Sequence, residues 1–328
     1  LEPIAAAEID TVGAVTKVGH REVHFESDDL SAAARLGSVD DVFVSCARIT
    51  GIGHTRESLR GLAERTRRLD VGAVAVRLGR RVATFDVSAS FLGARNYNRF
   101  EIEDAIGGAI SATTGWQYVR RAEEASSGDL TVRAHLREDE ALIGVRIGER
   151  PLHRRPYKLE SPKGSLHPPV AFAMAMLAGL RPKERVLDPF CGAGTIAIEA
   201  ARTQRLEALA SDLDPDAVGM TVRNAARAGV DVRAFVADAA RPPLAHADRI
   251  ITNLPWGHGV ATRGRLGEDP ARWWDEVREV GPVIVALTAS PPRGEVSARI
   301  PISLFGRHPE IVVVGGAIPE PISRRLAG

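Results

Sequence analysis

The sequence predicts an α/β protein in which a mostly parallel sheet, covered by helices on both faces, follows an α+β domain. Three observations support this prediction. The C-terminal half alternates strand-like and helix-like segments at short spacing, whereas the N-terminal half lacks that regular alternation. Between the halves, prolines interrupt residues 151–170, which are therefore predicted to form a linker.

In the C-terminal half, short apolar runs are predicted to form the parallel strands, because each is followed by a segment with helical features. A helix opened by Pro215 and stopped by Gly229 is the clearest of these. Two late runs are expected to close the sheet as an antiparallel pair. The predicted strands are 185–188, 207–213, 232–237, 249–252, 283–287, 298–304 and 311–314, and the predicted helices are 195–201, 215–228 and 270–280.

The N-terminal half mixes strand-like and helix-like segments too evenly to predict a topology. An amphipathic helix with a basic outer face is expected over 59–69 and a second helix over 101–114. The predicted domains are an N-terminal segment (1–55), an α+β domain (56–150), the linker (151–170) and the C-terminal domain (171–328). The predicted strands of this half are 39–47, 71–78, 82–87, 130–136 and 141–147.

Composition excludes several classes of protein. Hydrophobic residues make up 44% and charged residues 26% of the 328 residues, which is typical of a folded globular protein and excludes wholesale disorder. The chain has neither a long apolar run nor a secretory signal, so no membrane association is expected. Its two cysteines, Cys46 and Cys191, exclude a disulfide framework and favour the cytoplasm. His24, His54 and His153 lack ligand spacing, so no metal is predicted.

The net charge of +1 does not by itself indicate a nucleic-acid-binding protein, but the basic residues are clustered. One cluster lies within 56–81 and another near the start of the predicted linker. Both clusters could contact phosphate groups, or could reflect an arginine-rich composition and local ion pairs with acids such as Glu149 and Glu160. The residues predicted to bind phosphate are Arg65, Arg68, Arg154, Arg155 and Lys158.

The glycine-containing segment 188–195 is the strongest local signal. It follows a short apolar strand and opens a helix, so its glycines let the backbone approach a ligand at the helix N-terminus. Asp212, at the end of the next strand, can accept hydrogen bonds from both hydroxyls of a ribose, with Asp214 as a second candidate. Asp238 and Ala239 could meet the edge of an adenine. The predicted cofactor-binding residues are Asp188, Pro189, Cys191, Gly192, Gly194, Thr195, Asp212, Leu213, Asp214, Asp238, Ala239 and Asn253.

Two nucleoside cofactors fit this pattern. The spacing of Gly192, Gly194 and Ala197 also matches the loose dinucleotide fingerprint, so a nicotinamide dehydrogenase is one alternative. The acid that precedes the glycines, and a polar–Pro–aromatic element after the fourth strand, favour S-adenosylmethionine instead. Titration with the two cofactors would separate these alternatives.

That polar–Pro–aromatic element, Asn253-Leu254-Pro255-Trp256, is the predicted catalytic segment. An exocyclic ring amine is a poor nucleophile because its lone pair is delocalised. The side-chain oxygen of Asn253 and the carbonyl of Leu254 can accept hydrogen bonds from such an amine and direct its lone pair at a methyl donor. Asn253 cannot take the proton, so it would be a positioning group. Trp256 would stack on the base. The alternative is a simple turn with a packed tryptophan.

Segments 188–195, 211–216 and 253–257 resemble motifs of class I S-adenosylmethionine-dependent methyltransferases that act on exocyclic amines. Segments 141–147, 151–157 and 166–171 resemble the end of a THUMP domain and its passage into such a methyltransferase. The resemblance covers about residues 55–328. It implies a Rossmann-like, mostly parallel seven-stranded sheet preceded by an α+β THUMP-containing domain, and residues 1–55 fit the family's ferredoxin-like segment by position only.

The resemblance further implies a tRNA guanine-N2 methyltransferase that uses S-adenosylmethionine and grips the tRNA acceptor end. Leu254 departs from the commoner Pro-Pro form and resembles the form found in the tRNA guanine-N2 branch. One alternative is a guanine-N2 or adenine-N6 methyltransferase that acts on ribosomal RNA or DNA. Another is an RNA-binding protein with a degenerate methyltransferase domain, against which the intact acidic, glycine and Asn253 positions argue.

Overall fold

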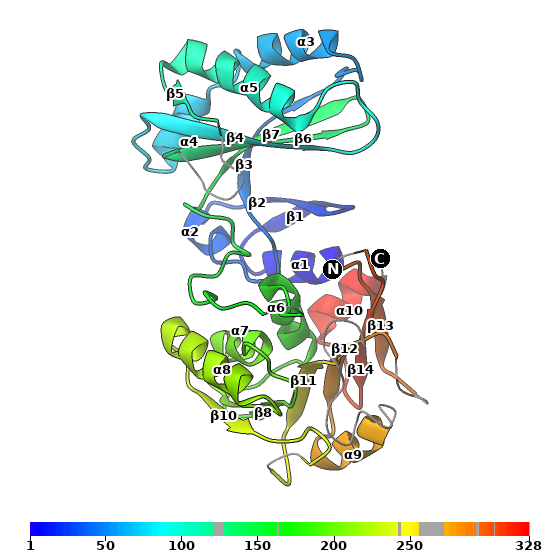
Figure 1. Ribbon diagram of the computed structural model, residues 1–328. Coiled ribbons are helices and arrows are strands. Elements are labelled where there is room, and N and C mark those ends of the chain that lie inside the picture. Colours follow the sequence, from blue (N-terminus) through cyan, green and yellow to red (C-terminus); the bar gives the residue numbers. More distant parts are fainter. Residues whose placement is uncertain are drawn as a thin grey trace. The chain divides into compact units, whose positions relative to one another are not determined.

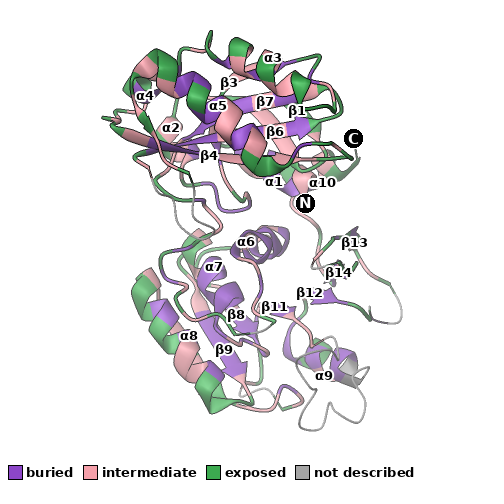
Figure 2. Cartoon of the chain, turned by 45° about the horizontal axis from the view of Figure 1, so that its top comes forward, coloured by how far each residue is buried: buried purple, intermediate pink, exposed green. Residues whose placement is uncertain are grey.

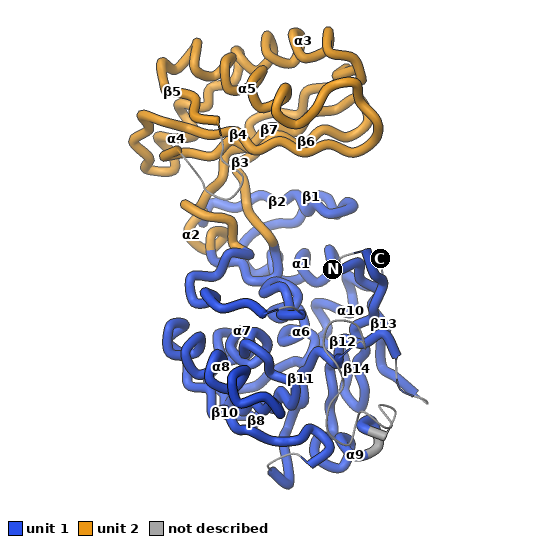
Figure 3. The backbone as a smooth tube through the Cα atoms, in the orientation of Figure 1, with its two compact units in different colours: residues 1–29, 35–39, 153–328 blue, residues 30–34, 40–152 orange. Residues whose placement is uncertain are grey.

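The structure is a computed structural model that describes residues 1–120, 128–162, 164–241, 244–255, 272–290, 292, 295–304 and 306–327. The chain divides into two compact units (Figure 3). Unit 1 comprises residues 1–29, 35–39 and 153–328, and unit 2 comprises residues 30–34 and 40–152. No helix in the described ranges combines the length and the apolar character of a membrane span.

Unit 1 is built on a seven-stranded sheet with the strand order β10-β9-β8-β11-β12-β14-β13 (Figure 1). Neighbouring strands from β10 to β12 are parallel, and β14 runs antiparallel to both of its neighbours. This confirms the predicted mostly parallel sheet and its antiparallel closing pair. The strands are β8 (Arg185–Asp188), β9 (Glu207–Asp212), β10 (Val232–Val236), β11 (Arg249–Asn253), β12 (Ile284–Thr288), β13 (Ala298–Pro301) and β14 (Glu310–Val314).

Helices cover both faces of this sheet because successive strand residues face opposite sides. Ile251 packs in an apolar cluster with Met174, whereas Ile250 packs in a second cluster with Trp273. In Figure 2, α6 is coloured as buried almost throughout, while the outer side of α8 is exposed. The helices that follow the linker are α6 (Pro168–Leu177), α7 (Thr195–Thr203), α8 (Pro215–Ala228), α9 (Arg272–Val280) and α10 (Glu320–Ala327).

The first 29 residues of the chain are part of unit 1, which differs from the predicted separate segment 1–55. Helix α1 (Glu2–Ile9) places Ile4 in the apolar cluster that contains Met174. A hairpin of β1 (Ala14–Gly19) and β2 (Glu22–Glu26) follows. Asp10, the residue after α1, forms a bidentate ion pair with Arg325 of α10 at 2.6 Å. Local sequence patterns do not encode such contacts between the two ends of a chain.

Unit 2 is an α+β unit with a five-stranded sheet of order β3-β7-β6-β4-β5. One sheet face is apolar and packs on helices, as shown by Phe85, Val132 and Ile143 in one cluster with Leu62 and Ile106. The elements are α2 (Leu30–Ala33), β3 (Phe43–Ile49), α3 (Glu57–Thr66), α4 (Val71–Arg77), β4 (Thr84–Phe91), α5 (Arg99–Thr114), β5 (Gln117–Tyr118), β6 (Leu130–Arg137) and β7 (Glu140–Arg146).

Residues 71–78 were predicted to form a strand, and this prediction is wrong because the segment forms α4. The carboxylate of Asp70 accepts a hydrogen bond from the Ala73 N–H (2.8 Å) and caps the helix N-terminus. Val71 and Ala75 lie one turn apart and are buried, whereas Val76 is 77% exposed. A short apolar run fits either type of element, so Asp70 was the signal that distinguished them.

Candidate active site

The predicted site residues meet at the carboxyl edge of the unit 1 sheet. Asp188 ends β8, Asp212 ends β9 and Asn253 ends β11. Because β8 lies between β9 and β11, these three ends are adjacent. Ligands bind outside the carboxyl ends of strands in open α/β sheets. The predicted cofactor and catalytic segments therefore share one edge.

The glycine segment forms a tight loop between β8 and α7. Gly192 and Gly194 adopt φ angles of 52° and 78°, in the left-handed region that favours glycine. A Cβ atom on Gly194 would lie 2.7 Å from the Cγ2 atom of Thr221, whereas one on Gly192 would have no atom within 4 Å. The loop is therefore packed against α8 at Gly194 and faces open space at Gly192.

Asp212 links this loop to the end of β9. Its Oδ2 atom accepts a hydrogen bond from the Gly192 N–H (2.9 Å), and its Oδ1 atom accepts one from the Asp214 N–H (3.0 Å). A carboxylate has about four lone-pair positions, so the half-buried Asp212 can accept further hydrogen bonds. Asp214 is exposed and caps α8 by accepting from the Asp216 N–H (2.9 Å). The geometry thus favours Asp212 over Asp214 as the ligand-binding acid.

Asp188 is buried beside the loop with one oxygen satisfied. Its Oδ1 atom accepts hydrogen bonds from the Thr252 hydroxyl (2.7 Å) and the Phe190 N–H (3.2 Å). Its Oδ2 atom is buried and has no partner among the described residues. Burial, together with the neighbouring charge of Asp212, raises the pKa of Asp188 to about 7. A cationic group of a ligand would supply the partner that Oδ2 lacks among the described residues.

Asn253 shows the feature that its predicted role requires. Its Oδ1 atom is buried and finds no hydrogen-bond partner in the part of the chain that the structure describes. Strand pairing with β12 fixes the backbone there, and the Leu254 N–H donates to the Leu287 carbonyl (3.0 Å). Pro255 ends the described stretch, so Trp256 lies outside the described residues. A buried acceptor without a partner is costly unless a ligand satisfies it.

The remaining predicted cofactor residues border the same edge. Asp238 follows β10, is half-buried and accepts a hydrogen bond from the Ala240 N–H (3.0 Å), and Ala239 beside it is buried. Leu213 is 42% exposed next to Asp212, which leaves an apolar surface available there. The Thr195 hydroxyl is buried at the N-terminus of α7 without a partner in the described ranges.

These residues fit S-adenosylmethionine, which presents a cationic sulfonium and amino group, a ribose and an adenine. Its cationic amino group matches the Oδ2 atom of Asp188, which lacks a partner among the described residues, and its ribose matches Asp212. The exposed space at Gly192 lets a ligand approach the loop. Fold and site together define a class I S-adenosylmethionine-dependent methyltransferase.

Comparisons with known proteins identify the family. Residues 154–269 match the family model of the RMKL-like methyltransferase domain. The chain is 34% identical over 255 residues to a tRNA (guanine(6)-N2)-methyltransferase of Thermus thermophilus, covering 72% of this chain and 71% of the relative. The crystal structure of TrmN from Thermus thermophilus matches with a TM-score of 0.73 and 29% identity, covering 96% of each chain.

A bovine relative, the U6 snRNA (guanine-N(2))-methyltransferase THUMPD2, is 28% identical over 269 residues. The match covers 74% of this chain and 51% of that relative. The chain belongs to the THUMP-containing class I RNA methyltransferases, in the branch of the tRNA guanine-N2 methyltransferases. Its cofactor is S-adenosylmethionine.

The prediction that Arg155 contacts phosphate is wrong in this structure, because the side chain is buried in an ion pair. Its Nε and Nη2 atoms donate to Glu199 of α7 (3.0 and 3.2 Å), and Nη2 also donates to the Gly37 carbonyl (2.6 Å). Tyr157 donates to the same carboxylate at 2.7 Å. Glu199 is fully buried, so this network fastens the predicted linker to α7. The sequence suggested Glu149 and Glu160 as ion-pair partners for the basic cluster, whereas the partner of Arg155 in the structure is Glu199.

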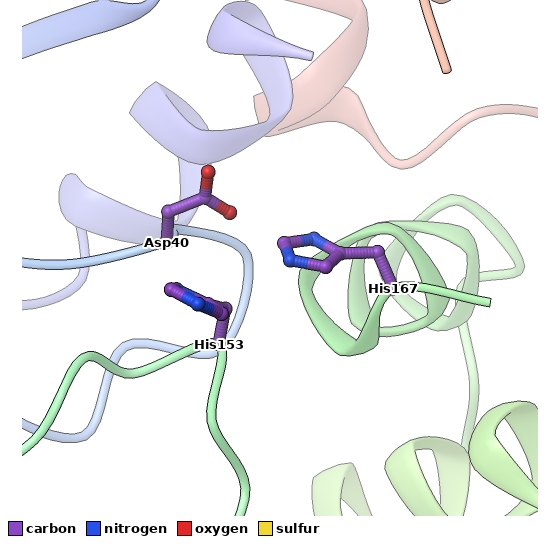
Figure 4. Close-up of side chains that lie close together, drawn as sticks. All are labelled: Asp40, His153 and His167. Atoms are coloured by element: carbon purple, nitrogen blue, oxygen red, sulfur yellow. The ribbon is translucent and has the colours of Figure 1, made fainter. Parts of the chain in front are cut away.

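Lys158 is also engaged within unit 1. Its ammonium group donates to the Leu166 carbonyl, and burial lowers its pKa to about 8. Nearby, the rings of His153 and His167 stack with centroids 5.2 Å apart (Figure 4), while Asp40, also drawn there, belongs to unit 2. Arg154 is exposed. Of the three linker cations predicted to bind phosphate, Arg154 is thus the one whose position favours an RNA contact.

In unit 2, the two predicted RNA-binding arginines differ. Arg65 is half-buried and donates to the carbonyls of Gly61 (3.1 Å) and Thr50, so it holds the end of β3 against α3. Arg68 is exposed after the helix. Arg68 therefore stays a candidate for phosphate contact, whereas the hydrogen bonds of Arg65 give it a structural role.

Sequence reasoning missed three buried polar residues that contact the site. Thr252 donates to Asp188, and Thr221 and Asn224 of α8 donate to carbonyls of the glycine loop. All three are fully buried. For two of them the sequence contained a signal. Thr221 and Asn224 are one turn apart on the face of an amphipathic helix where apolar residues are expected, and polar residues there indicate buried hydrogen bonds.

Proposed function

We propose that this chain transfers the methyl group of S-adenosylmethionine to the exocyclic N2 of a guanosine in tRNA. The observation that supports this proposal best is the buried Oδ1 atom of Asn253 at the end of β11, which has no hydrogen-bond partner among the described residues. Such an acceptor suits an amine donor. The tRNA guanine-N2 activity in the name of the Thermus relative supports the N2 of guanosine as that amine.

The role of Asn253 and Leu254 is to bind the amine. S-adenosylmethionine, when bound, supplies a methyl group on a positively charged sulfur. The Asn253 Oδ1 atom and the Leu254 carbonyl accept hydrogen bonds from the two amine hydrogens, which favours a pyramidal nitrogen whose lone pair points at the methyl carbon. The donor would supply the methyl group for the new N–C bond and leave as S-adenosylhomocysteine, and the nitrogen held by Asn253 and Leu254 would release its proton to water. Asn253 thus acts by placement, with effects of the kind expected from aligned reactants.

The cofactor would be bound by the loop and the neighbouring strand ends. Asp212 would accept hydrogen bonds from the ribose, Asp238 and Ala239 would border the adenine, and Asp188 would pair with the amino group. Gly192 and Gly194 would let the loop backbone come close to the cofactor, and Thr195 would border it at the N-terminus of α7. Pro189, Cys191 and Leu213 would line the pocket.

Unit 2 is proposed to be the THUMP module that holds the tRNA acceptor end. Exposed Arg68 in unit 2 and exposed Arg154 in the linker would contact phosphates. The target nucleotide must leave its stack to reach the Asn253 edge, at a cost of about a few kcal/mol. The cytoplasmic location and the absence of a metal stay predictions.

The test is methylation of total tRNA from a strain that lacks this protein, followed by digestion and mass spectrometry of the nucleosides. N2-methylguanosine is the expected product. Parallel reactions with ribosomal RNA and DNA separate the alternatives, since N6-methyladenosine, or methylation of those substrates alone, would contradict the proposal. No transfer to any of them would favour the RNA-binding alternative.

Substitution of Asn253 links the product to the site. Asn253→Ala is expected to lower the single-turnover rate by about a hundredfold to a thousandfold, the usual effect of removing one preorganised hydrogen bond. Cofactor affinity should stay near wild type, because Asn253 faces the amine. Asn253→Asp keeps an acceptor and should retain partial activity. A wild-type rate for Asn253→Ala would remove the mechanistic basis of the guanine-N2 assignment.

A further inference from the structure

Two buried side chains of α8 donate hydrogen bonds to carbonyls of the glycine loop. The Thr221 hydroxyl donates to the Gly192 carbonyl (3.0 Å), and the Asn224 side-chain amide donates to the Ala193 carbonyl (3.0 Å). Both side chains are fully buried. Neither belongs to the loop or to the strand ends that surround it.

These contacts fix the direction of two consecutive peptide groups. In a planar trans peptide, the C=O and the following N–H point in opposite directions. Because the Gly192 carbonyl points at Thr221, the Ala193 N–H points away from α8. The position of Gly192, where a Cβ would meet nothing within 4 Å, shows that open space lies beside the loop. The Thr221 contact therefore directs the Ala193 N–H away from α8, whereas the next N–H, that of Gly194, donates to the Cys191 carbonyl within the loop (2.7 Å).

The other side of the loop is fastened independently. The Cys191 N–H donates to the Ser211 carbonyl (2.9 Å), and the Gly192 N–H donates to Asp212 (2.9 Å). These contacts come from β9 and satisfy N–H groups, whereas Thr221 and Asn224 satisfy carbonyls. Without the α8 contacts, the two carbonyls would lose their buried partners, and the loop could rotate toward the ligand space to find water.

Packing alone does not explain why polar side chains are buried at positions 221 and 224, because burying a polar group costs free energy. The Asn224 Oδ1 atom is buried and has no partner in the described part of the chain. An apolar residue would avoid that cost, as Ala217 and Ala225 do on the same helix. The polar side chains at 221 and 224 are thus matched to the two carbonyls of the loop.

We infer that Thr221 and Asn224 are positioning residues that hold the glycine loop in its cofactor-binding conformation. They act through the loop backbone and touch neither the reacting amine nor the methyl carbon. The inference rests on cofactor binding by this loop and is independent of which nucleic acid is methylated. It adds α8 to the elements that determine cofactor affinity.

The test compares variants that separate hydrogen bonding from packing. Thr221→Val keeps the side-chain shape and removes the hydroxyl, whereas Thr221→Ser keeps the hydroxyl and removes the methyl group that packs on Gly194. Calorimetry with S-adenosylhomocysteine on the full chain measures the Kd. Loss of one hydrogen bond is expected to raise the Kd about three- to tenfold for Thr221→Val, and Thr221→Ser should stay within about twofold of wild type.

Asn224→Leu provides an independent variant with the same expected increase. If both residues hold one loop, the double variant should raise the Kd by less than the product of the two single effects. The kcat at saturating cofactor should change by less than about twofold, because the amine-holding groups are intact. Val222→Ala, on the exposed side of α8, is the matched control and should bind as wild type does.

Some results would overturn the inference. If Thr221→Val and Asn224→Leu both bind S-adenosylhomocysteine as tightly as wild type does, the side chains do not position the loop. If Thr221→Ser binds more weakly than Thr221→Val, packing is the operative contact and the inference is wrong. The unaltered chain is measured first, and its failure to bind would overturn the cofactor assignment and, with it, the role of α8.

Discussion

Replacement of Asp188 by Asn should stabilise the free protein in a pH-dependent way and weaken cofactor binding. Burial raises the pKa of Asp188 from 3.8 to about 7. The folded state therefore binds more protons than the unfolded state between these values. The stability that this group contributes is fully present below about pH 4 and is lost as the pH rises to about 7. A shift of about three pKa units corresponds to about 4 kcal/mol.

The Asp188→Asn variant avoids this pH-dependent loss of stability, because the asparagine side chain is neutral at every pH. Its Oδ1 atom can keep the hydrogen bonds from Thr252 (2.7 Å) and Phe190 (3.2 Å). Its amide group would occupy the Oδ2 position, which has no partner among the described residues, at a cost of about 1–3 kcal/mol. We therefore expect a net gain in the free energy of unfolding of about 1–3 kcal/mol at pH 8.5 and no gain at pH 4.5.

Urea unfolding at pH 4.5, 6 and 8.5 measures the difference between wild type and Asp188→Asn. Calorimetry with S-adenosylhomocysteine should show weaker binding by the variant, since its neutral amide cannot pair with the ligand ammonium. Asp231→Asn, at an exposed position, serves as the control and should show little pH-dependent difference. A stability difference that is the same at all three pH values would refute the raised pKa, and unchanged affinity would remove Asp188 from the cofactor site.

Three further predictions concern the linker, the ribose contact and the RNA surface. Arg155→Ala should lower the free energy of unfolding by about 3–5 kcal/mol in urea, because it deprives buried Glu199 of a charged partner; a smaller loss would show that the pair is dispensable. Asp212→Ala should weaken S-adenosylhomocysteine binding by about 1–3 kcal/mol in calorimetry, and unchanged affinity would contradict a ribose contact. The double reversal Arg68→Glu and Arg154→Glu should weaken tRNA binding and flatten its salt dependence while cofactor affinity holds; an unchanged slope would place both arginines outside the interface.

The parallel sheet could be predicted because its signals are local. Helix α8 begins at Pro215 and ends before Gly229, as the sequence indicates. The strands of this half are short apolar runs that recur at the spacing of alternating strands and helices. The N-terminal residues gave no such signal, because α1 is stabilised by its packing on α6 and by the Asp10–Arg325 ion pair near the other end of the chain. Contacts between distant segments cannot be read from periodicity.

The positions of the site residues could also be predicted, since a parallel sheet brings strand ends to one edge. Asp188, Asp212 and Asn253 lie where that rule places them. The same reasoning failed for Arg155, because a basic residue in a polar linker looks exposed until the buried carboxylate that pairs with it is known. Charge in a sequence indicates what a side chain can bind, and the fold decides which partner it meets.

Two buried acids near the glycine loop differ in how many of their oxygens find hydrogen-bond partners among the described residues. Asp188 at the end of β8 and Glu199 in α7 lie on either side of the glycine loop in the sequence, and both are buried. Glu199 accepts hydrogen bonds from Arg155, Tyr157 and Arg202, so both of its oxygens are satisfied within the chain. Asp188 has an oxygen without a partner among the described residues, as Asn253 has at the adjacent strand end. A buried acceptor that the protein does not satisfy destabilises the fold, and a donor from a ligand would relieve that cost. The two orphaned oxygens thus identify the edge where cofactor and amine are expected to bind, a distinction that depends on counting contacts that only the folded chain has.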